Sequence, residues 1–179
     1  MLSLWDRKAP NAFSCLSFPK IYPKTAFIGV IYMKKVEIFT DGACRGNPGP
    51  GDYGCILVYG AHRKELSGGE ASTTNNRMEL MAAIAGLSAL TEPCAVRLYS
   101  DSKYLVDAVT LGWLQGWQAK GYRRGKKDEV KNIDLWERLS KLLSYHTVEF
   151  TWVKGHDGHP ENERCDALAT AAADAAREV

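Results

Sequence analysis

The chain has 179 residues and a formal net charge of only +2 at neutral pH, which suits one ordinary domain and excludes nucleic-acid binding through overall charge alone. Hydrophobic residues make up 45% of the chain, enough for a substantial core, but no run reaches the roughly 18 apolar residues that a membrane span needs. The five cysteines are odd in number and lack CxxC spacing, which argues against a disulfide framework or a zinc site and predicts reduced thiols in a cytoplasmic protein.

Residues 1–32 differ from the rest of the chain. They hold three of the seven prolines, show little periodicity and contain one weak apolar run at 26–32. Met33 and the two lysines after it look like a natural protein start. We therefore expect an N-terminal extension at 1–32, disordered or produced by a start codon assigned too far upstream, and a folded domain at 33–179. A targeting peptide is the alternative, because cations outnumber Asp6, the single acid of the segment.

The next segment has the alternation of a β-sheet. Period-2 patterns predict strands at Val36–Asp41, Tyr53–Tyr59 and Arg63–Ser67. The run Gly46–Gly51, rich in glycine and proline, predicts a turn between the first two. Three strands in sequence predict an antiparallel meander.

Helices and strands then alternate along the chain. Apolar residues at helical spacing predict a first helix at Thr74–Leu90, and Trp136 is expected in the core of a later one. The expected elements after the first helix are a strand at Ala95–Ser100, helices at Asp101–Leu111 and around Ile133–Leu143, a strand at Val148–Val153 and a helix from Pro160. This order predicts an α/β protein with one mixed sheet and helices on its faces.

Between these helices lies a basic segment, residues 113–131, which begins with two tryptophans and continues with a group of cations. From Lys120 to Lys131 six lysines and arginines face two acids, a net charge of +4 compared with +2 for the whole chain. Such patches commonly contact phosphate backbones.

Four carboxylates stand where a carboxylate is locally awkward: Asp41 ends the first strand, Glu79 lies in a helix, Asp101 follows a later strand and Asp166 lies in the last helix. Each alone has a plain explanation, as a turn residue, a helix cap or a solvated charge. If the first and fourth strands are neighbours, the four can meet, and each pair at about 4 Å would cost roughly 4 kcal/mol without a cation. All-oxygen ligands select Mg²⁺ or Mn²⁺, and two such ions can cleave a phosphodiester.

The residues around these carboxylates form blocks that resemble bacterial type 1 ribonuclease H. The blocks are Ile38–Cys44 (IFTDGAC), Gly46–Gly51 (GNPGPG), Thr73–Leu80 (TTNNRMEL), Asp101-Ser102 with Tyr104, Trp152–His156 (WVKGH) and Gly158–Asp166 (GHPENERCD). They occur in order over about residues 33–176. The resemblance implies a ribonuclease H-like fold, with a five-stranded mixed sheet made of an antiparallel meander of strands 1–3 plus parallel strands 4–5, and a catalytic domain at 33–179.

The resemblance also implies site residues. Asp41, Glu79, Asp101 and Asp166 match the family's metal ligands, for two Mg²⁺ ions with Mn²⁺ as the alternative. His156 matches a loop histidine suited to proton transfer or product departure. Glu163 matches an acid that escorts metal or product, although an ordinary first-turn glutamate explains it equally well.

Substrate recognition follows in the same way. An RNA–DNA hybrid is distinguished by the 2′-OH groups of one strand, and the family implies that Asn47 and Asn75 meet them while Thr74, Asn75 and Asn76 hold a DNA phosphate. N-capping is a compatible explanation for the latter group. Four residues of the basic segment resemble the family's protrusion that grips DNA: Trp113, Trp117, Lys120 and Arg123. Two departures are Gln118-Ala119, where relatives carry more cations, and Lys103, where an amide is frequent.

The expected protein is a monomeric cytoplasmic endonuclease that hydrolyses the RNA strand of RNA–DNA hybrids, leaving 5′-phosphate and 3′-hydroxyl ends. Removal of primers and R-loops is its expected work, and a single-stranded-DNA-binding protein is a candidate partner. Two alternatives stay open at this point, a DNA nuclease on the same fold and a catalytically inactive hybrid-binding module.

Overall fold

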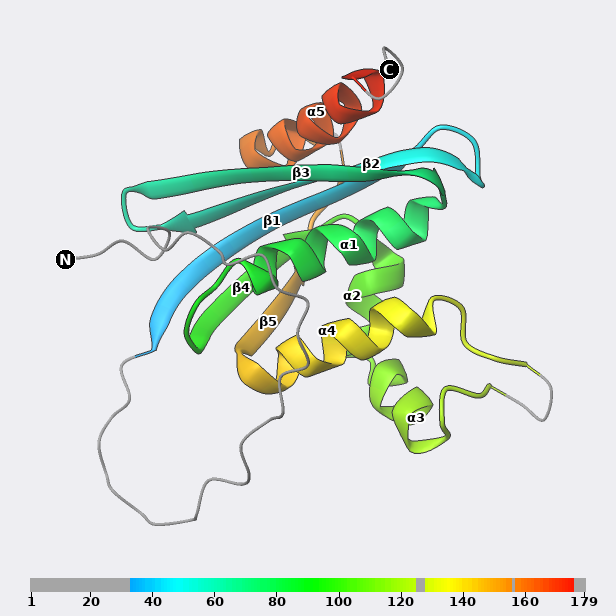
Figure 1. The fold of residues 1–179 in the computed structure, drawn as a ribbon. Helices are drawn as coiled ribbons and strands as arrows, with labels where there is room; N and C mark the ends of the chain where they lie inside the picture. Colours follow the sequence, from blue (N-terminus) through cyan, green and yellow to red (C-terminus); the bar gives the residue numbers. More distant parts are fainter. Residues whose placement is uncertain (1–32, 125–127, 156, 176–179) are drawn as a thin grey trace, which may run out of the picture.

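The computed structural model describes residues 33–124, 128–155 and 157–175, so the expected extension at 1–32 and the loop histidine His156 lie outside the described residues. The described part contains one five-stranded sheet with the order β3-β2-β1-β4-β5 (Figure 1). The strands are β1 (Lys34–Cys44), β2 (Gly49–Tyr59), β3 (His62–Thr73), β4 (Cys94–Ser100) and β5 (Thr147–Trp152).

The strand directions confirm the predicted mixed sheet. β1 pairs antiparallel with β2, and β2 antiparallel with β3, which forms the meander. β1 also pairs parallel with β4, which pairs parallel with β5. The first and fourth strands are therefore neighbours, and their carboxyl ends meet at one edge of the sheet.

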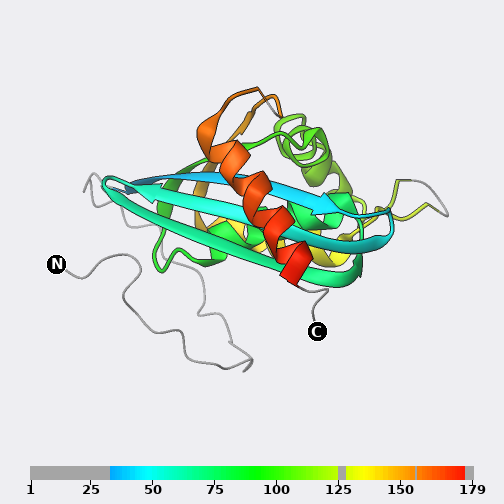
Figure 2. The same cartoon turned by 90° about the horizontal axis from the view of Figure 1, so that it is seen from above.

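Helices cover both faces of this sheet. They are α1 (Asn75–Ser88), α2 (Lys103–Thr110), α3 (Trp113–Ala119), α4 (Ile133–Tyr145) and α5 (Pro160–Ala175). α1 and α4 lie on one face, whereas α5 crosses the other face over the meander (Figures 1 and 2). The described residues contain no helix that is long and apolar enough to span a membrane.

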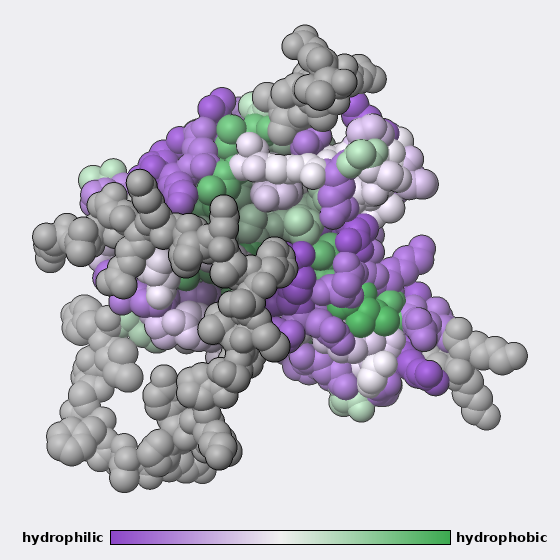
Figure 3. Space-filling view, in the orientation of Figure 1, coloured by the Kyte–Doolittle hydropathy of each residue, from purple (hydrophilic) through white to green (hydrophobic). Residues whose placement is uncertain are grey.

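Two hydrophobic clusters hold the layers together. The larger lies between the sheet and α1, α2 and α4, and it includes Ile38, Leu98 and Trp136, all with 0% exposure, which confirms the prediction for Trp136. The smaller joins α5 to the sheet through Phe39, Ile56 and Cys165. Outside the clusters, the face seen in Figure 3 is mainly hydrophilic with small hydrophobic patches. The large exposed apolar side chains among the described residues are Leu111, Trp113, Tyr145 and Trp152.

Several predicted boundaries are wrong: β1 continues to Cys44 beyond the predicted end at Asp41, and β3 continues to Thr73 beyond the predicted end at Ser67. The turn predicted at Gly46–Gly51 ends early, because β2 already begins at Gly49. Gly51 pairs with Cys44, and a Cβ at Gly51 would lie 2.5 Å from Thr73 Cγ2. Because glycine has no side chain, this glycine-rich run can pair with the neighbouring strands. The helix predicted from Asp101 begins at Lys103, with the Ser102 hydroxyl accepting from Leu105 N at 3.3 Å as the N-cap.

Candidate active site

Three of the four predicted carboxylates converge at the carboxyl edge of β1 and β4. One oxygen each from Asp41, Glu79 and Asp101 lies within 4.8 Å of the other two. The parallel register pairs Thr40 with Ser100, so Asp41 and Asp101 follow neighbouring positions on adjacent strands. Because Ser102 caps α2, the Asp101 carboxylate is not engaged in capping.

Gly42 explains why Glu79 can join this pair. A Cβ at Gly42 would lie 2.4 Å from Glu79 N and 2.5 Å from Met78 C, so the α1 backbone touches β1 at this point. Any side chain there would push the helix away. The contact places Glu79, with only 4% exposure, directly over the end of the central strand.

The cluster is electrostatically unfavourable by itself. Burial, followed by the nearby charges of Asp41 and Asp101, raises the pKa of Glu79 well above its usual range, and the Gly42 backbone amide opposes this only in part. Glu79 Oε2 and Asp101 Oδ1 are buried without a hydrogen-bond partner among the described residues. Unpaired buried carboxylate oxygens are costly unless a cation satisfies them. This donor set of hard oxygens therefore fits a divalent cation of the Mg²⁺ type.

The loop after β5 closes over the same edge. A Cβ at Gly155 would lie 2.5 Å from Asp101 Oδ2. Trp152 at the end of β5 donates from Nε1 to the Asp101 carbonyl at 3.0 Å, and Lys103 Nζ lies 5.1 Å from the centre of its ring. Trp152 was not predicted as a site residue; the WVKGH motif that begins with it was the available signal for its position beside Asp101.

Asp166 lies outside the three-carboxylate group. It is half-buried in α5 and follows Cys165, whose Sγ donates to the Phe39 carbonyl at 3.3 Å. A Cβ at Gly54 would lie 2.1 Å from the Cys165 carbonyl oxygen, and Gly54 is the cross-strand partner of Asp41. α5 therefore carries Asp166 past the strand pair that holds Asp41, and its role as a fourth ligand stays a prediction. Glu163 is exposed in the first turn of α5.

The residues predicted to contact the RNA 2′-OH groups or a DNA phosphate lie on two segments. Asn47 is exposed in the connection between β1 and β2. Thr74 occupies the N-cap position of α1 without a capping hydrogen bond from its side chain, and Asn75 and Asn76 begin the helix with exposed side chains. The helix that presents Glu79 to the cluster thus presents these three residues at its N-terminus.

The basic segment contains α3 and the residues after it. Trp113 is 43% exposed, and Lys120 and Arg123 are exposed. Trp117 is half-buried and packs edge-on against Trp136 with 5.4 Å between ring centroids. The four predicted contacts therefore divide into three exposed residues and one, Trp117, that fastens the segment to the core.

Comparisons with known proteins agree with this geometry. The family model described as RNase H matches residues 33–174. A Ribonuclease H from Desulforamulus reducens is 60% identical over 141 residues, 79% of this chain and 89% of that protein. Among solved structures, LC9-RNase H1, a type 1 RNase H with the type 2 active-site motif, superposes with a TM-score of 0.74 at 32% identity, covering 82% of this chain and 75% of that one.

A second solved structure, LC11-RNase H1 in complex with an RNA/DNA hybrid, has a TM-score of 0.56 at 24% identity and covers 79% of this chain and 98% of that one, a likeness of fold alone. The sheet order, the carboxylates at its edge and these matches lead to one conclusion: the chain belongs to the ribonuclease H family.

Proposed function

We propose that this protein is an endoribonuclease that hydrolyses the RNA strand of RNA–DNA hybrids with the help of divalent cations. Its family membership makes it a ribonuclease H hydrolase. The observation that carries the proposal is the cluster of Asp41, Glu79 and Asp101. One oxygen of each lies within 4.8 Å of the other two, and two oxygens of the cluster are buried without a hydrogen-bond partner in the described part of the chain.

In this proposal Asp41, Glu79, Asp101 and Asp166 hold two divalent ions, Mg²⁺ or alternatively Mn²⁺. Bound ions of this kind supply activation of water and stabilisation of the departing oxygen. The protein's own contribution is to keep the carboxylates together before substrate arrives. The contact of Gly42 with α1 and the hydrogen bond of Trp152 to the Asp101 carbonyl fix two of them in place.

The reaction is hydrolysis of one phosphodiester bond. The oxygen of water forms a bond to phosphorus and the bond from phosphorus to the 3′-oxygen breaks. Water loses one proton and the leaving 3′-oxygen gains one, so the step balances. The products carry a 5′-phosphate and a 3′-hydroxyl. His156 is proposed to assist the proton transfer or the departure of product.

Discrimination of the hybrid would depend on two surfaces. Asn47 and Asn75 are exposed on segments beside the cluster, where polar side chains can bond the 2′-OH groups that only the RNA strand carries. Thr74 and Asn76 would hold a DNA phosphate near the start of α1, and Trp113, Lys120 and Arg123 would contact the DNA strand farther away. The fold is shared with LC11-RNase H1, which was solved with an RNA/DNA hybrid bound.

The expected cellular setting is part of the proposal. A monomeric enzyme of this kind in the cytoplasm would remove RNA primers and R-loops. A single-stranded-DNA-binding protein is a candidate partner in such work.

The test uses end-labelled RNA–DNA hybrid, RNA–RNA and DNA–DNA duplexes, each with Mg²⁺, Mn²⁺ or EDTA. We expect metal-dependent cleavage of the RNA strand of the hybrid alone, with 3′-hydroxyl ends that a polymerase can extend. Cleavage of DNA would favour a DNA nuclease on this fold, and binding without cleavage in either metal would favour an inactive hybrid-binding module.

A further inference from the structure

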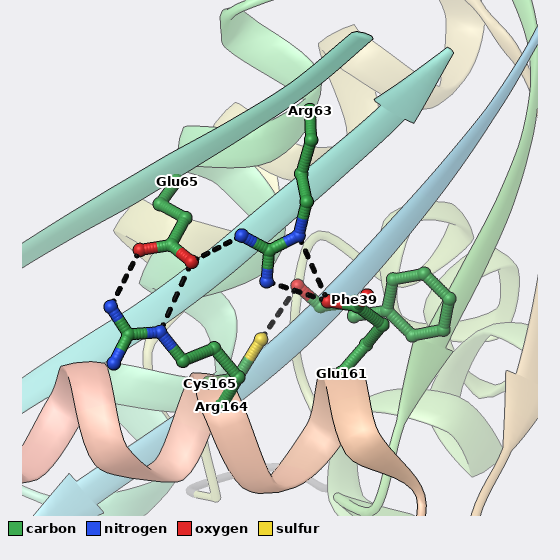
Figure 4. A network of polar contacts seen from close by, with 6 residues as sticks. All are labelled: Phe39, Arg63, Glu65, Glu161, Arg164 and Cys165. Carbon is green, nitrogen blue, oxygen red and sulfur yellow. Dashed lines mark hydrogen bonds and ion pairs between the residues drawn. The ribbon is translucent and has the colours of Figure 1, made fainter. Parts of the chain in front are cut away.

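An ion-pair network fastens α5 to the edge strand β3 (Figure 4). Glu65 of β3 accepts two hydrogen bonds from Arg164, from Nε at 3.1 Å and from Nη2 at 2.9 Å. Arg63, also on β3, donates to Glu161 of α5 at 2.8 Å and contacts Glu65 as well. Glu65 is thus the acceptor that both arginines share.

The central carboxylate of the network, Glu65, stays ionised at neutral pH. Hydrogen bonds from Arg164, and then from Arg63, lower the pKa of Glu65 to about 2. Single ion pairs near the surface contribute little to stability, whereas bidentate arginine–carboxylate pairs in a network hold a defined geometry. The network is therefore expected to act mainly on the position of α5 and less on the stability of the fold.

Successive residues of α5 connect this network to the active site. Side chains on an α-helix turn by about 100° per residue, so Arg164, Cys165 and Asp166 point in three different directions. Cys165 faces the sheet, since it is fully buried and donates to the Phe39 carbonyl. Arg164 points towards β3 (Figure 4). Asp166 therefore projects from the opposite flank of the helix, the side of β1 and β4.

Contacts with the sheet and with β3 together determine how α5 is rotated about its own axis. The Cys165 carbonyl lies so close to β2 that a Cβ at Gly54 would approach it to 2.1 Å, which fixes the height of the helix above the sheet. Its roll, the rotation about its own axis, is limited by side-chain contacts: Cys165 with Phe39 on the sheet side and the ion pairs on the β3 side. The tether from Arg164 to Glu65 opposes that roll on one side. A roll towards β3 or away from it changes how far Asp166 reaches towards Asp41, Glu79 and Asp101.

We propose that Glu65 is a positioning residue: by holding Arg164 it sets the roll of α5 and thereby places Asp166 within reach of the metal-binding carboxylates. This inference rests on the proposed function, in which Asp166 is a metal ligand. Glu65 itself touches neither metal nor substrate in this view.

The test compares Glu65→Gln, Arg164→Gln and their double variant with Glu149→Gln. The control removes one charge from an exposed pair between β4 and β5, where Glu149 of β5 lies 3.4 Å from Arg97 of β4. Mn²⁺ binding is measured by calorimetry, hybrid cleavage is titrated with Mg²⁺, and thermal unfolding is followed for each protein. We expect Glu65→Gln to weaken metal affinity about three- to tenfold, less than the 10- to 100-fold loss typical for direct partners of ligands.

The double variant should lose no more affinity than the single ones, because both changes cut the same tether. Saturating Mg²⁺ should restore most of the cleavage rate of Glu65→Gln. Metal affinity within twofold of wild type would overturn the inference, and so would a lower melting temperature without a change in the metal titration. Failure of the wild-type protein to bind metal or cleave the hybrid would instead remove the proposed function, and this inference with it.

Discussion

The carboxylate cluster and the basic segment around α3 are built in opposite ways. Asp41 and Glu79 are 8% and 4% exposed and are held by close contacts of backbone with backbone. In the basic segment the charged groups are exposed, and Trp117 alone of its four predicted contacts packs against the core. A site for chemistry needs fixed geometry, whereas a site for phosphate contacts works through charge in solvent. The following experiments probe this contrast.

The largest effect is expected for Asp41→Asn. Loss of a ligand charge should remove several kcal/mol of transition-state stabilisation and lower hybrid cleavage about 10³-fold or more. Hybrid affinity, measured in EDTA by fluorescence anisotropy, should stay close to wild type because the basic segment is intact. Asp107→Asn on α2 is the matched control and should cleave normally. Mg²⁺-dependent turnover near the wild-type rate in Asp41→Asn would contradict the metal assignment.

Two glycine substitutions test how tightly each region is packed. Gly42→Ala places a methyl group 2.4 Å from Glu79 N, so we expect about 1–3 kcal/mol of lost stability together with a lower cleavage rate, as α1 moves. Gly116→Ala in α3 meets no atom within 4 Å and should be neutral or should stabilise the helix by roughly 0.5–1 kcal/mol. Chemical denaturation and cleavage assays measure both. If both substitutions changed stability and cleavage equally, the carboxylate cluster and the basic segment would not differ in how tightly they are packed.

Charge removal from the basic segment should act on binding alone. Lys120→Ala should lower the dependence of log affinity on log salt by about one unit, with the rate at saturating substrate unchanged. Lys141→Ala, an exposed lysine of α4, is the control. A reduced maximal rate for Lys120→Ala with an unchanged salt dependence would place Lys120 in the chemistry rather than in phosphate contact.

A smaller effect is expected for the pH dependence of stability, and it involves His146, which belongs to neither region. Burial lowers the pKa of His146 below its usual value of 6.5, and its Nδ1 accepts from Cys94 N at 3.3 Å. The unfolded chain therefore binds a proton more readily than the folded one, so stability should fall as the pH drops through about 6.5. Denaturation at pH 7.5 and 5.5 measures this change. His146→Gln should be less sensitive to pH, and an unchanged pH slope would exclude His146 as its source.

Much of the fold was predictable because periodicity reports which face of an element is buried. The five strands, the meander and the core position of Trp136 follow from such patterns. The end of β4 at Ser100 was predictable as well, whereas β1 continues to Cys44, beyond its predicted end at Asp41. The parallel pairing of the two strands still brings Asp41 and Asp101 together.

Other features depend on contacts between distant parts of the chain. That α1 touches β1 at Gly42 is visible only when both elements are in place. The start of β2 at Gly49 depends on pairing with its neighbours, which overrides the turn preference of glycine and proline. The contacts of Trp152 with Asp101 and of Glu65 with Arg164 are tertiary as well. A sequence motif marks Trp152, whereas no periodic or local pattern marks Glu65.

The late position of α5 in the chain has a consequence for the protein during its own synthesis. A ribosome exposes β1 to β5 before α5, and so the sheet with Asp41, Glu79 and Asp101 can form while Cys165 and Asp166 are still to come. If Asp166 completes the metal site, a nascent chain stays incapable of cutting until α5 docks over Gly54. Cleavage competence would then appear in one late step of folding, rather than gradually as the chain emerges.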